Sequence, residues 1–343
     1  MAAIDLSANA RTLHESFCRF SLTACCQVPP ASVSRMMSSP DVILGARKFE
    51  NDFLCNKASG LHPSEVSPIT ETLGLDHVSY NWGSSTNDNY QSENDYDLGI
   101  FASIRQQLDY EYHSYYKAPR RRLQDDIIES FLSDHPIDDT NSSDQWIIFT
   151  AGCMGAGKTH TLRELSKDDI FSFDLNSFVS VDPDEIRSQL PEYRVYIEKD
   201  PLHAGEFTRK EAGMLVEILT EEALERGNNV LVDGSLKDAV WYKAYFEMLR
   251  HKYPRIKIGI IHVTAPVEDI LQRVEQRAQT TGRRIPMDVL VESMVQVPKS
   301  VNELCRDADL FLEVDNSSGN DIRFTRVKGM ESLNPGNHKI KVQ

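Results

Sequence analysis

The second half of the chain alternates between short apolar runs and longer segments in which apolar residues recur with helical spacing. Five apolar runs have the length of buried strands in a parallel sheet, at residues 146–150, 178–181, 230–232, 257–263 and 310–314. Helical patterns follow them, starting at Thr159 and Asp184 and covering residues 208–226, 267–279 and 287–304. This alternation predicts an α/β fold with a parallel sheet and helices on both faces.

Residues 1–143 follow a different pattern. Up to residue 97 the chain is rich in Ser, Asn, Asp and Pro, a composition typical of segments with little fixed structure. Between residues 98 and 132, apolar and aromatic side chains recur near helical spacing on both sides of Pro119, which indicates two helices packed on the next domain. We therefore expect a low-order extension (1–97), a helical segment with a polar linker (98–143), an α/β domain (144–316), and a tail (317–343) with one extra strand near 324–327.

The composition narrows the choice of partners. The 343-residue chain is 40% hydrophobic and has a formal net charge of −15, so it can build a sizeable core but lacks the basic face that nucleic-acid binding needs. The densest basic run, Arg120 to Arg122, is followed at once by Asp125 and Asp126, and we interpret it as a solvated helix face. Nucleic acid is therefore not an expected partner.

The cysteine pattern and the hydropathy of the chain indicate its cellular compartment. None of the six cysteines forms a C-x-x-C pair, and their spacing suits neither a zinc site nor a disulfide framework, which favours a reducing compartment. No stretch approaches the ~20 apolar residues that a membrane span requires. We expect a cytoplasmic protein without membrane contact. The alternative, an organelle transit peptide, rests only on Arg11 and Arg19 around a weakly amphipathic run.

One motif carries most of the chemical information. Residues 152–159 match G-x-x-x-x-G-K-[ST], between an apolar run and a helical pattern. Its glycines let backbone N–H groups turn toward phosphate oxygens, and the following helix adds the positive end of its dipole. Lys158 is expected to reach the β- and γ-phosphates of ATP, and the Thr159 hydroxyl to bind Mg²⁺. The predicted nucleotide-binding residues are Gly152, Cys153, Met154, Gly155, Ala156, Gly157, Lys158, Thr159 and His160.

Acidic residues follow two of the predicted strands. Asp182 and Asp184 come after residues 178–181, and Asp233 comes after residues 230–232. The carboxyl ends of parallel strands share one edge of the sheet, where ligands bind in open α/β folds. Asp184 can be the general base that accepts the proton of an attacking hydroxyl, or it can cap a helix. Asp233 can orient Mg²⁺ through water, contact the substrate, or cap a turn.

Basic residues gather after the fourth predicted strand. Arg273 and Arg277 are one helical turn apart, and Arg283 and Arg284 follow a few residues later. Arginines over the phosphates of a kinase stabilise the charge that spreads on the transferred phosphoryl group. Such a cluster in an acidic chain favours a catalytic lid over a surface that only aids solubility. Glu211, by contrast, would from its spacing alone be a solvated helix residue.

These motifs, in this order, resemble the zeta-toxin family of P-loop kinases, in particular its eukaryotic-type members. The resemblance covers residues 146–316 and rests on the phosphate loop and four further segments: Asp182-Pro183-Asp184 with Arg187, Pro191 and Tyr193; Arg209-Lys210-Glu211-Ala212; Asp233-Gly234-Ser235; and Arg277 with Thr281-Gly282-Arg283 and Pro286. It implies that Lys158 binds the transferred phosphoryl group, that Thr159 holds Mg²⁺ and that Asp184 is the general base. Arg277 and Arg283 would stabilise the phosphoryl group in flight. The implied substrate-binding residues are Asp182, Glu211, Asp233 and Ser235.

The resemblance also implies an activity, an ATP- and Mg²⁺-dependent kinase that phosphorylates a hydroxyl of a nucleotide-containing metabolite. Bacterial members of the family act on UDP-N-acetylglucosamine, and some plant relatives act on NAD under calmodulin control. This chain differs from the bacterial members in having Asp233 where they tend to have Glu, and in its long segment before the loop. The alternatives are an NAD kinase, a kinase of polynucleotide 5′-hydroxyls, and an ATP-binding switch without catalysis. We expect the segment before the loop to regulate access to the site and to be the place where a regulatory protein partner binds.

Overall fold

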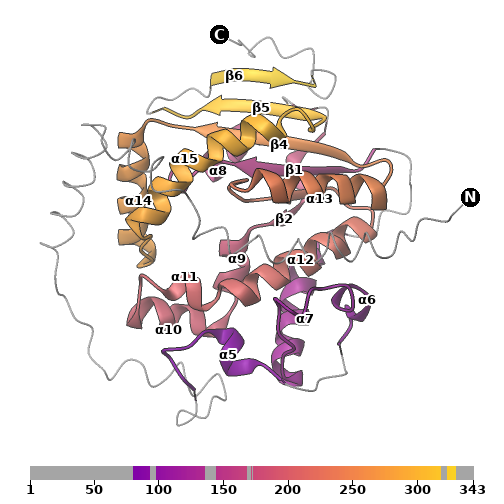
Figure 1. Ribbon diagram of the computed structural model, residues 1–343, viewed down its shortest axis with the longest axis vertical. Coiled ribbons are helices and arrows are strands. Elements are labelled where there is room, and N and C mark those ends of the chain that lie inside the picture. The colour runs from indigo at the N-terminus through magenta and orange to yellow at the C-terminus, as the bar shows by residue number, and fades with distance from the viewer. Residues whose placement is uncertain are drawn as a thin grey trace, which may run out of the picture.

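The computed structural model describes residues 80–92, 98–135, 144–167, 171, 173–317 and 323–329. Within these residues six strands form one sheet, in the order β2-β3-β1-β4-β5-β6 (Figure 1). The strands are β1 (Trp146–Ala151), β2 (Val179–Val181), β3 (Val230–Val232), β4 (Lys257–Thr264), β5 (Leu310–Asp315) and β6 (Arg323–Lys328). The first five pair in parallel and β6 pairs antiparallel with β5. The predicted α/β fold is therefore confirmed, and the extra strand in the tail is present.

Helices connect the parallel strands. They are α8 (Lys158–Lys167), α9 (Pro183–Ser188), α10 (Pro191–Lys199), α11 (Ala204–Phe207), α12 (Arg209–Glu225), α13 (Ala239–Lys252), α14 (Val267–Thr281) and α15 (Met287–Leu304). A 3-10 turn at Leu175–Ser177 precedes β2. The sequence patterns missed α10, α11 and α13, although the buried residues of α13, Tyr245, Phe246 and Leu249, follow helical spacing. Among the described helices, none is both long and apolar enough to cross a bilayer.

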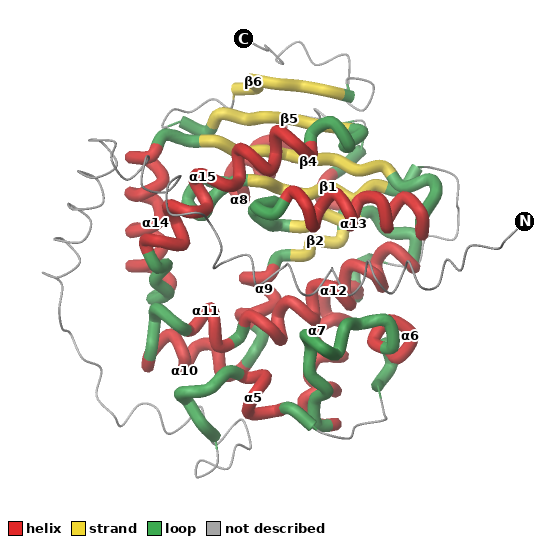
Figure 2. The backbone as a smooth tube through the Cα atoms, in the orientation of Figure 1, coloured by secondary structure: helices red, strands yellow, loops and turns green. Residues whose placement is uncertain are grey.

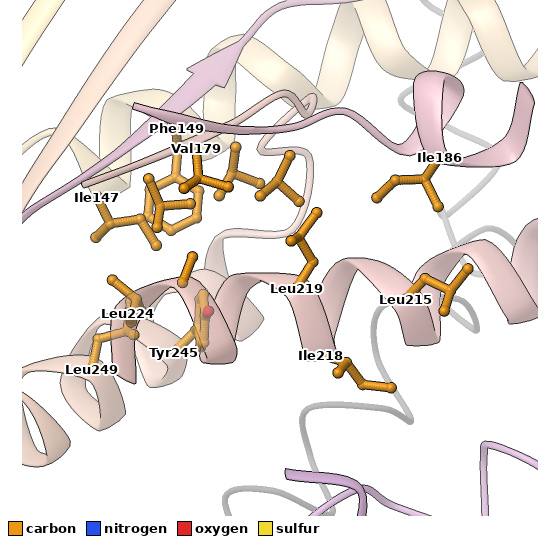
Figure 3. Close-up of a cluster of buried hydrophobic side chains, with 14 of the residues drawn as sticks. Ile147, Phe149, Val179, Ile186, Leu215, Ile218, Leu219, Leu224, Tyr245 and Leu249 are labelled. Atoms are coloured by element: carbon orange, nitrogen blue, oxygen red, sulfur yellow. The ribbon is translucent and has the colours of Figure 1, made fainter. Parts of the chain in front are cut away.

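The side chains of β1 show why the sheet is covered on both faces. Ile147 and Phe149 belong to one buried cluster and Ile148 belongs to the other, as the two-residue period of a strand requires. The first cluster includes residues of α12 and α13, such as Leu219 and Tyr245, which Figure 3 shows beneath the strand. The second cluster joins residues of α8 and α14 to the opposite face. Both faces are thus dry, which explains the uninterrupted apolar runs.

The segment before β1 is folded onto α12. Its helices α5 (Thr86–Tyr90), α6 (Ala102–Arg105) and α7 (Ala118–Leu132) lie along α12, below the sheet in the view of Figure 2. The second predicted helix corresponds to α7. The first prediction was wrong in extent, because only one helical turn forms in α6 and the stretch up to Tyr116 consists mainly of turns.

The expected low-order extension also differs from the structure where it can be compared. Residues 80–92 include α5, which begins with a capping box between Ser85 and Asp88. The ring of Trp82 meets the ring of Tyr196 edge-on, with centroids 5.5 Å apart, and the Tyr80 hydroxyl lies 2.7 Å from the Tyr196 hydroxyl. A polar segment is therefore ordered by aromatic contacts with α10. Residues 1–79 and 93–97 lie outside the described part of the chain.

A buried ion cluster, formed by Arg120, Glu192 and Glu211, joins α7 to α10 and α12. The Arg120 guanidinium donates to both oxygens of Glu211, at 2.7 and 3.0 Å, and to both oxygens of Glu192, each at 3.0 Å. Arg120 is only 4% exposed and Glu211 is 0% exposed. The interpretation of this basic run as a solvated face is thus wrong for Arg120 and for the equally buried Arg121, whereas Arg122 is exposed.

The charge balance of this cluster decides the state of Glu211. Burial by itself would raise the pKa of this carboxyl, but the charge of Arg120 and its hydrogen bonds outweigh burial and lower the pKa below its ordinary value. The ionised form of Glu211 therefore stabilises the fold above its ordinary pKa, and this stabilisation is lost as the pH falls through the lowered value.

Replacing Arg120 by methionine should remove the countercharge and leave two buried carboxylates. We expect a loss of about 3–5 kcal/mol in the free energy of unfolding at pH 7.5, the usual cost of breaking a buried pair. The loss should be smaller at pH 4.5, because a buried carboxyl without a partner has a raised pKa and is then protonated. Urea unfolding at both pH values measures this. The control is Arg122→Met on the same helix, and equal losses in the two variants would contradict the prediction.

Candidate active site

The phosphate loop follows β1 and leads directly into α8. Gly155 and Gly157 have φ angles of +86° and +91°, which side-chain-bearing residues rarely adopt. A Cβ at Gly157 would lie 2.0 Å from Nδ2 of Asn316, and one at Gly155 would lie 2.7 Å from the carbonyl oxygen of Ile270. These glycines are required both by the backbone turn and by close contacts with the rest of the protein. The loop therefore has the curled shape that the motif predicts.

Two side chains brace the loop from outside. Arg273 of α14 donates from Nη1 to the carbonyl oxygen of Ala156 at 3.2 Å, and from Nη2 to that of Asn316 at 2.9 Å. Nδ2 of Asn316, just after β5, donates to the same oxygen of Ala156 at 2.8 Å. The Ala156 carbonyl oxygen is therefore held by two donors from distant parts of the chain. Sequence spacing drew attention to Arg273 but did not indicate this contact.

The predicted nucleotide-binding residues differ in how far their side chains are exposed to solvent. Lys158 is half-buried at the start of α8, with Nζ 3.4 Å from the carbonyl oxygen of Gly152, while Thr159 and His160 are exposed at the same helix end. Cys153 is only 8% exposed and packs in the second core cluster, and burial raises the pKa of its thiol. Thr159 and His160 thus face solvent, whereas the thiol has the environment of a core residue.

Asp184 is the meeting point of three arginines. Its Oδ2 accepts from Arg277 of α14 at 2.6 Å, its Oδ1 accepts from Arg283 at 2.6 Å, and Arg187 of α9 also binds Oδ1. Burial alone would raise the pKa of Asp184, but the three cations, Arg283 most strongly, lower it to about 2. The structure therefore brings the predicted base together with both predicted phosphoryl-stabilising arginines.

The two neighbouring aspartates have distinct positions. Asp182 caps α9, since its Oδ1 accepts from the backbone N–H of Asp184 at 2.8 Å. The capping role that the sequence left open for Asp184 thus belongs to Asp182. Asp233 follows β3 and accepts a hydrogen bond from the Thr150 hydroxyl at the end of β1. Burial and the nearby charge of Asp233 raise the pKa of Asp182, so the two carboxylates are close.

The remaining predicted substrate contacts differ in accessibility. Ser235, two residues beyond Asp233, is half-buried near the end of β3. Glu211 has no exposed surface, because Arg120 occupies both of its oxygens and Gln124 donates to Oε1 at 2.7 Å. A direct contact between Glu211 and a substrate does not fit this arrangement, in which the carboxylate holds α7 in place.

A cavity beside these groups was missed by the sequence analysis. It has a volume of about 250 Å³, and we call it the aromatic recess. Its walls come from six parts of the chain, which include Tyr112 and His113 before α7, Phe149 of β1, Arg187 of α9, Glu217 and Thr220 of α12, Val232 and Asp233 at the end of β3, and Trp241, Tyr242 and Tyr245 of α13. The spacing of the α13 aromatics, at i, i+1 and i+4, was a visible signal, but it becomes meaningful only once α13 lies over the ends of β1 and β3.

Comparisons with known proteins agree with this geometry. The family model described as Zeta toxin matches residues 131–320. The AvrRxo1-ORF1:-ORF2 complex with ATP superposes with a TM-score of 0.51 and 15% identity, covering 74% of this chain and 79% of that one. Its native form gives 0.50 and 16%, covering 75% and 80%.

The PezAT toxin–antitoxin system of Streptococcus pneumoniae gives a TM-score of 0.47 with 22% identity, covering 59% of this chain and 80% of that one. No match was found among curated proteins. The structural likenesses concern the fold, whereas the family model covers more than half of the sequence. With its phosphate loop, its strand-end aspartates and its arginine-bearing helix in the expected order, the chain belongs to the zeta toxin family of P-loop kinases.

Proposed function

We propose that this protein is an ATP- and Mg²⁺-dependent kinase that transfers the γ-phosphate to a hydroxyl of a nucleotide-containing metabolite. One observation carries the proposal. On α14, Arg273 binds the phosphate loop and Arg277, one turn later, binds Asp184. A single rigid helix therefore links the place where a triphosphate is held to the carboxylate that would activate the acceptor.

The residues of the loop suit the donor nucleotide. The backbone N–H groups of the curled loop and the amino end of α8 attract phosphate oxygens, and Lys158 adds a full positive charge there. Thr159 is the residue that would bind Mg²⁺, and the ion would neutralise charge on the β- and γ-phosphates. A protein of the same fold has been solved with ATP, which supports ATP as the donor.

The ion pairs of Asp184 suggest an order of events. In this structure the carboxylate neutralises Arg277 and Arg283. A bound triphosphate would compete for the same guanidinium groups, because phosphate oxygens carry more charge than one carboxylate. As the arginines turn toward the phosphates, the pKa of Asp184 would rise toward its ordinary value, and Asp184 would become a stronger base. The base would thus be released only after the donor has bound.

The family suggests the chemical class of the acceptor but does not identify the molecule. UDP-N-acetylglucosamine is the acceptor that the resemblance implies, and NAD is the alternative from the same class. The aromatic recess beside Asp184 suits the ring of either. A polynucleotide 5′-hydroxyl is less compatible with a net charge of −15. An ATP-binding switch without catalysis would leave the pairing of Asp184 with two lid arginines unexplained.

We also propose a cellular compartment and a regulatory role for the segment before β1. A cytoplasmic location agrees with the cysteine pattern. The segment before β1 is a suitable place for a regulatory protein, because α7 contacts α12 through the Arg120 ion cluster. A partner that pulled on α7 would act directly on the helix that lines the aromatic recess.

A phosphate-transfer screen tests the proposed function. Labelled ATP is incubated with the full chain and UDP-N-acetylglucosamine, NAD, nucleosides or a 5′-hydroxyl oligonucleotide. We expect one nucleotide-type metabolite to be labelled, and Asp184→Asn to lower kcat by roughly 10²–10⁴-fold, the usual contribution of a general base. Lys158→Ala should abolish transfer. Equal transfer by the Asp184→Asn protein would refute the assignment of the base, and ATP binding without any transfer would favour the switch.

The brace on the phosphate loop gives a separate prediction. Arg273→Met removes two charge-assisted hydrogen bonds, each of which typically contributes about 1.5–3 kcal/mol. Part of that loss should appear in ATP binding, because the loop amides are then less well fixed. We expect the Kd for Mg·ATP, measured by calorimetry, to rise about tenfold or more, which corresponds to ~1.4 kcal/mol. The control is Arg163→Met on the exposed face of α8. An unchanged Kd in the Arg273→Met protein would show that the brace does not support binding.

A further inference from the structure

Arg277 and Arg283 bind the same carboxylate but are held in different ways. The Arg277 side chain is 48% exposed on α14, whereas the Arg283 side chain is only 19% exposed. Arg283 belongs to the loop between α14 and α15, residues 282–286, so no helix fixes its backbone. Contacts from outside this loop must therefore hold the Arg283 guanidinium.

The closest of these contacts is with Gly205 of α11. A Cβ at position 205 would lie 3.0 Å from Nη2 of Arg283, 3.2 Å from its Nε and 3.3 Å from its Cζ. These separations are shorter than ordinary van der Waals contacts, and all three atoms belong to the guanidinium group. The guanidinium therefore occupies the space that a side chain at position 205 would need.

The backbone of α11 does not itself require a glycine at this position. Gly155 and Gly157 of the phosphate loop have positive φ angles, but Gly205 does not. An alanine inside a helix is more stable than a glycine, because glycine loses more conformational freedom on folding. What the glycine permits is the close approach of Arg283.

A second contact comes from Tyr193 of α10. Its hydroxyl interacts with the Arg283 guanidinium, and the centroid of its ring lies 5.9 Å from Cζ of Arg187. Burial alone would lower the pKa of Arg283, but the Asp184 carboxylate and Tyr193 outweigh burial and raise the pKa. Tyr193 thus contacts two of the three arginines that surround Asp184.

The loop that carries Arg283 also rests on α10 and on the turn before α11. The backbone N–H of Arg284 donates to the carbonyl oxygen of Pro201 at 3.1 Å, and a Cβ at Gly282 would lie 2.8 Å from Cγ2 of Ile197. α10 is in turn bound to α7 through the Arg120 ion cluster. The support beneath Arg283 is therefore fixed by the segment before β1.

We propose that Gly205 is a positioning residue for Arg283, the arginine expected to stabilise the transferred phosphoryl group. Without a side chain at position 205, the guanidinium rests against α11 with Nη1 at Asp184. From there Nη1 can exchange the carboxylate oxygen for a phosphate oxygen of the bound donor. An arginine fixed in advance stabilises developing charge without first having to be ordered. The inference rests on the proposed function, because it concerns an arginine of the same site.

Two substitutions of graded size test this role. We expect Gly205→Ala to lower kcat about 3- to 10-fold and Gly205→Leu roughly 10²-fold, because a misplacement of about 1 Å can cost that much. The KM for ATP should change less than about threefold, since the lost interaction is made mainly in the transition state. The melting temperature of the Gly205→Ala protein should stay the same or rise, because alanine favours the helix. A purely structural glycine would lose stability and activity together.

The matched control is Gly83→Ala, whose Cβ would meet Oδ1 of Asn81 at 3.4 Å and no part of Arg283. Its kcat should stay within about twofold of the wild type. Equal losses of kcat in Gly83→Ala and Gly205→Ala would overturn the proposal, as would a wild-type kcat in both Gly205 variants.

A double-mutant cycle shows whether Gly205 acts through Arg283. Single-turnover assays with excess enzyme keep the slow Arg283→Ala protein measurable. In that background we expect Gly205→Leu to cause no further loss of rate, because the guanidinium that it would displace is gone. A further loss as large as in the wild-type background would overturn the positioning role, whatever the melting temperatures show.

A spectroscopic measurement separates this proposal from the proposed function. In a chain with ¹⁵N-labelled arginine, the Nε–H signal of Arg283 is identified by its loss in Arg283→Lys. We expect slow exchange of this proton with water in the wild type, and faster exchange in Gly205→Leu. If the wild type transfers phosphate to no acceptor, the proposed function fails, while this signal still reports whether Gly205 holds Arg283. If transfer is robust and the signal and kcat are unchanged in Gly205→Leu, the kinase assignment stands and the positioning role is refuted.

Discussion

Parallel pairing of β2, β3 and β1 is the constraint on which the site depends. Because parallel strands end at one edge, the phosphate loop after β1, Asp182 and Asp184 after β2, and Asp233 after β3 must all lie along that edge. The pairing is in turn held by cores on both faces of the sheet. A hydrogen bond from the Thr150 hydroxyl to Asp233 then ties the end of β1 to the end of β3. The proposed chemistry is thus positioned by strands that are packed on both faces.

The second organising feature is the balance of charge around Asp184. Three arginines converge on the Asp184 carboxylate close to the phosphate loop, in a chain whose overall charge is negative. These arginines are placed to interact with a triphosphate, the ligand that the adjoining loop is proposed to hold. α14 makes the two parts one unit, because the same helix contacts the loop and Asp184. Binding of the donor and release of the base are therefore coupled in the proposed mechanism.

The segment before β1 is attached to the α/β domain by buried charge. Arg120 of α7 neutralises two carboxylates that would otherwise be buried without a counterion, and so fixes α7 against α10 and α12. A few residues earlier, Tyr112 and His113 form part of the wall of the aromatic recess. The expected regulatory role of this segment has a physical route here, since any movement of α7 relative to α12 would alter the recess.

The sequence by itself determined the features that depend on local signals. Apolar runs and glycine-containing turns predicted the five parallel strands, and the spacing in residues 152–159 predicted the curled loop that the glycine conformations confirm. The order of motifs predicted the family.

Tertiary structure alone decided which charged residues are buried. Arg120 and Arg122 are two positions apart and chemically alike, yet only Arg120 meets Glu192 and Glu211, which lie 72 and 91 residues further along the chain. The recess likewise needs α13 to lie over the ends of β1 and β3. Contacts between distant segments depend on packing, and no local pattern encodes them.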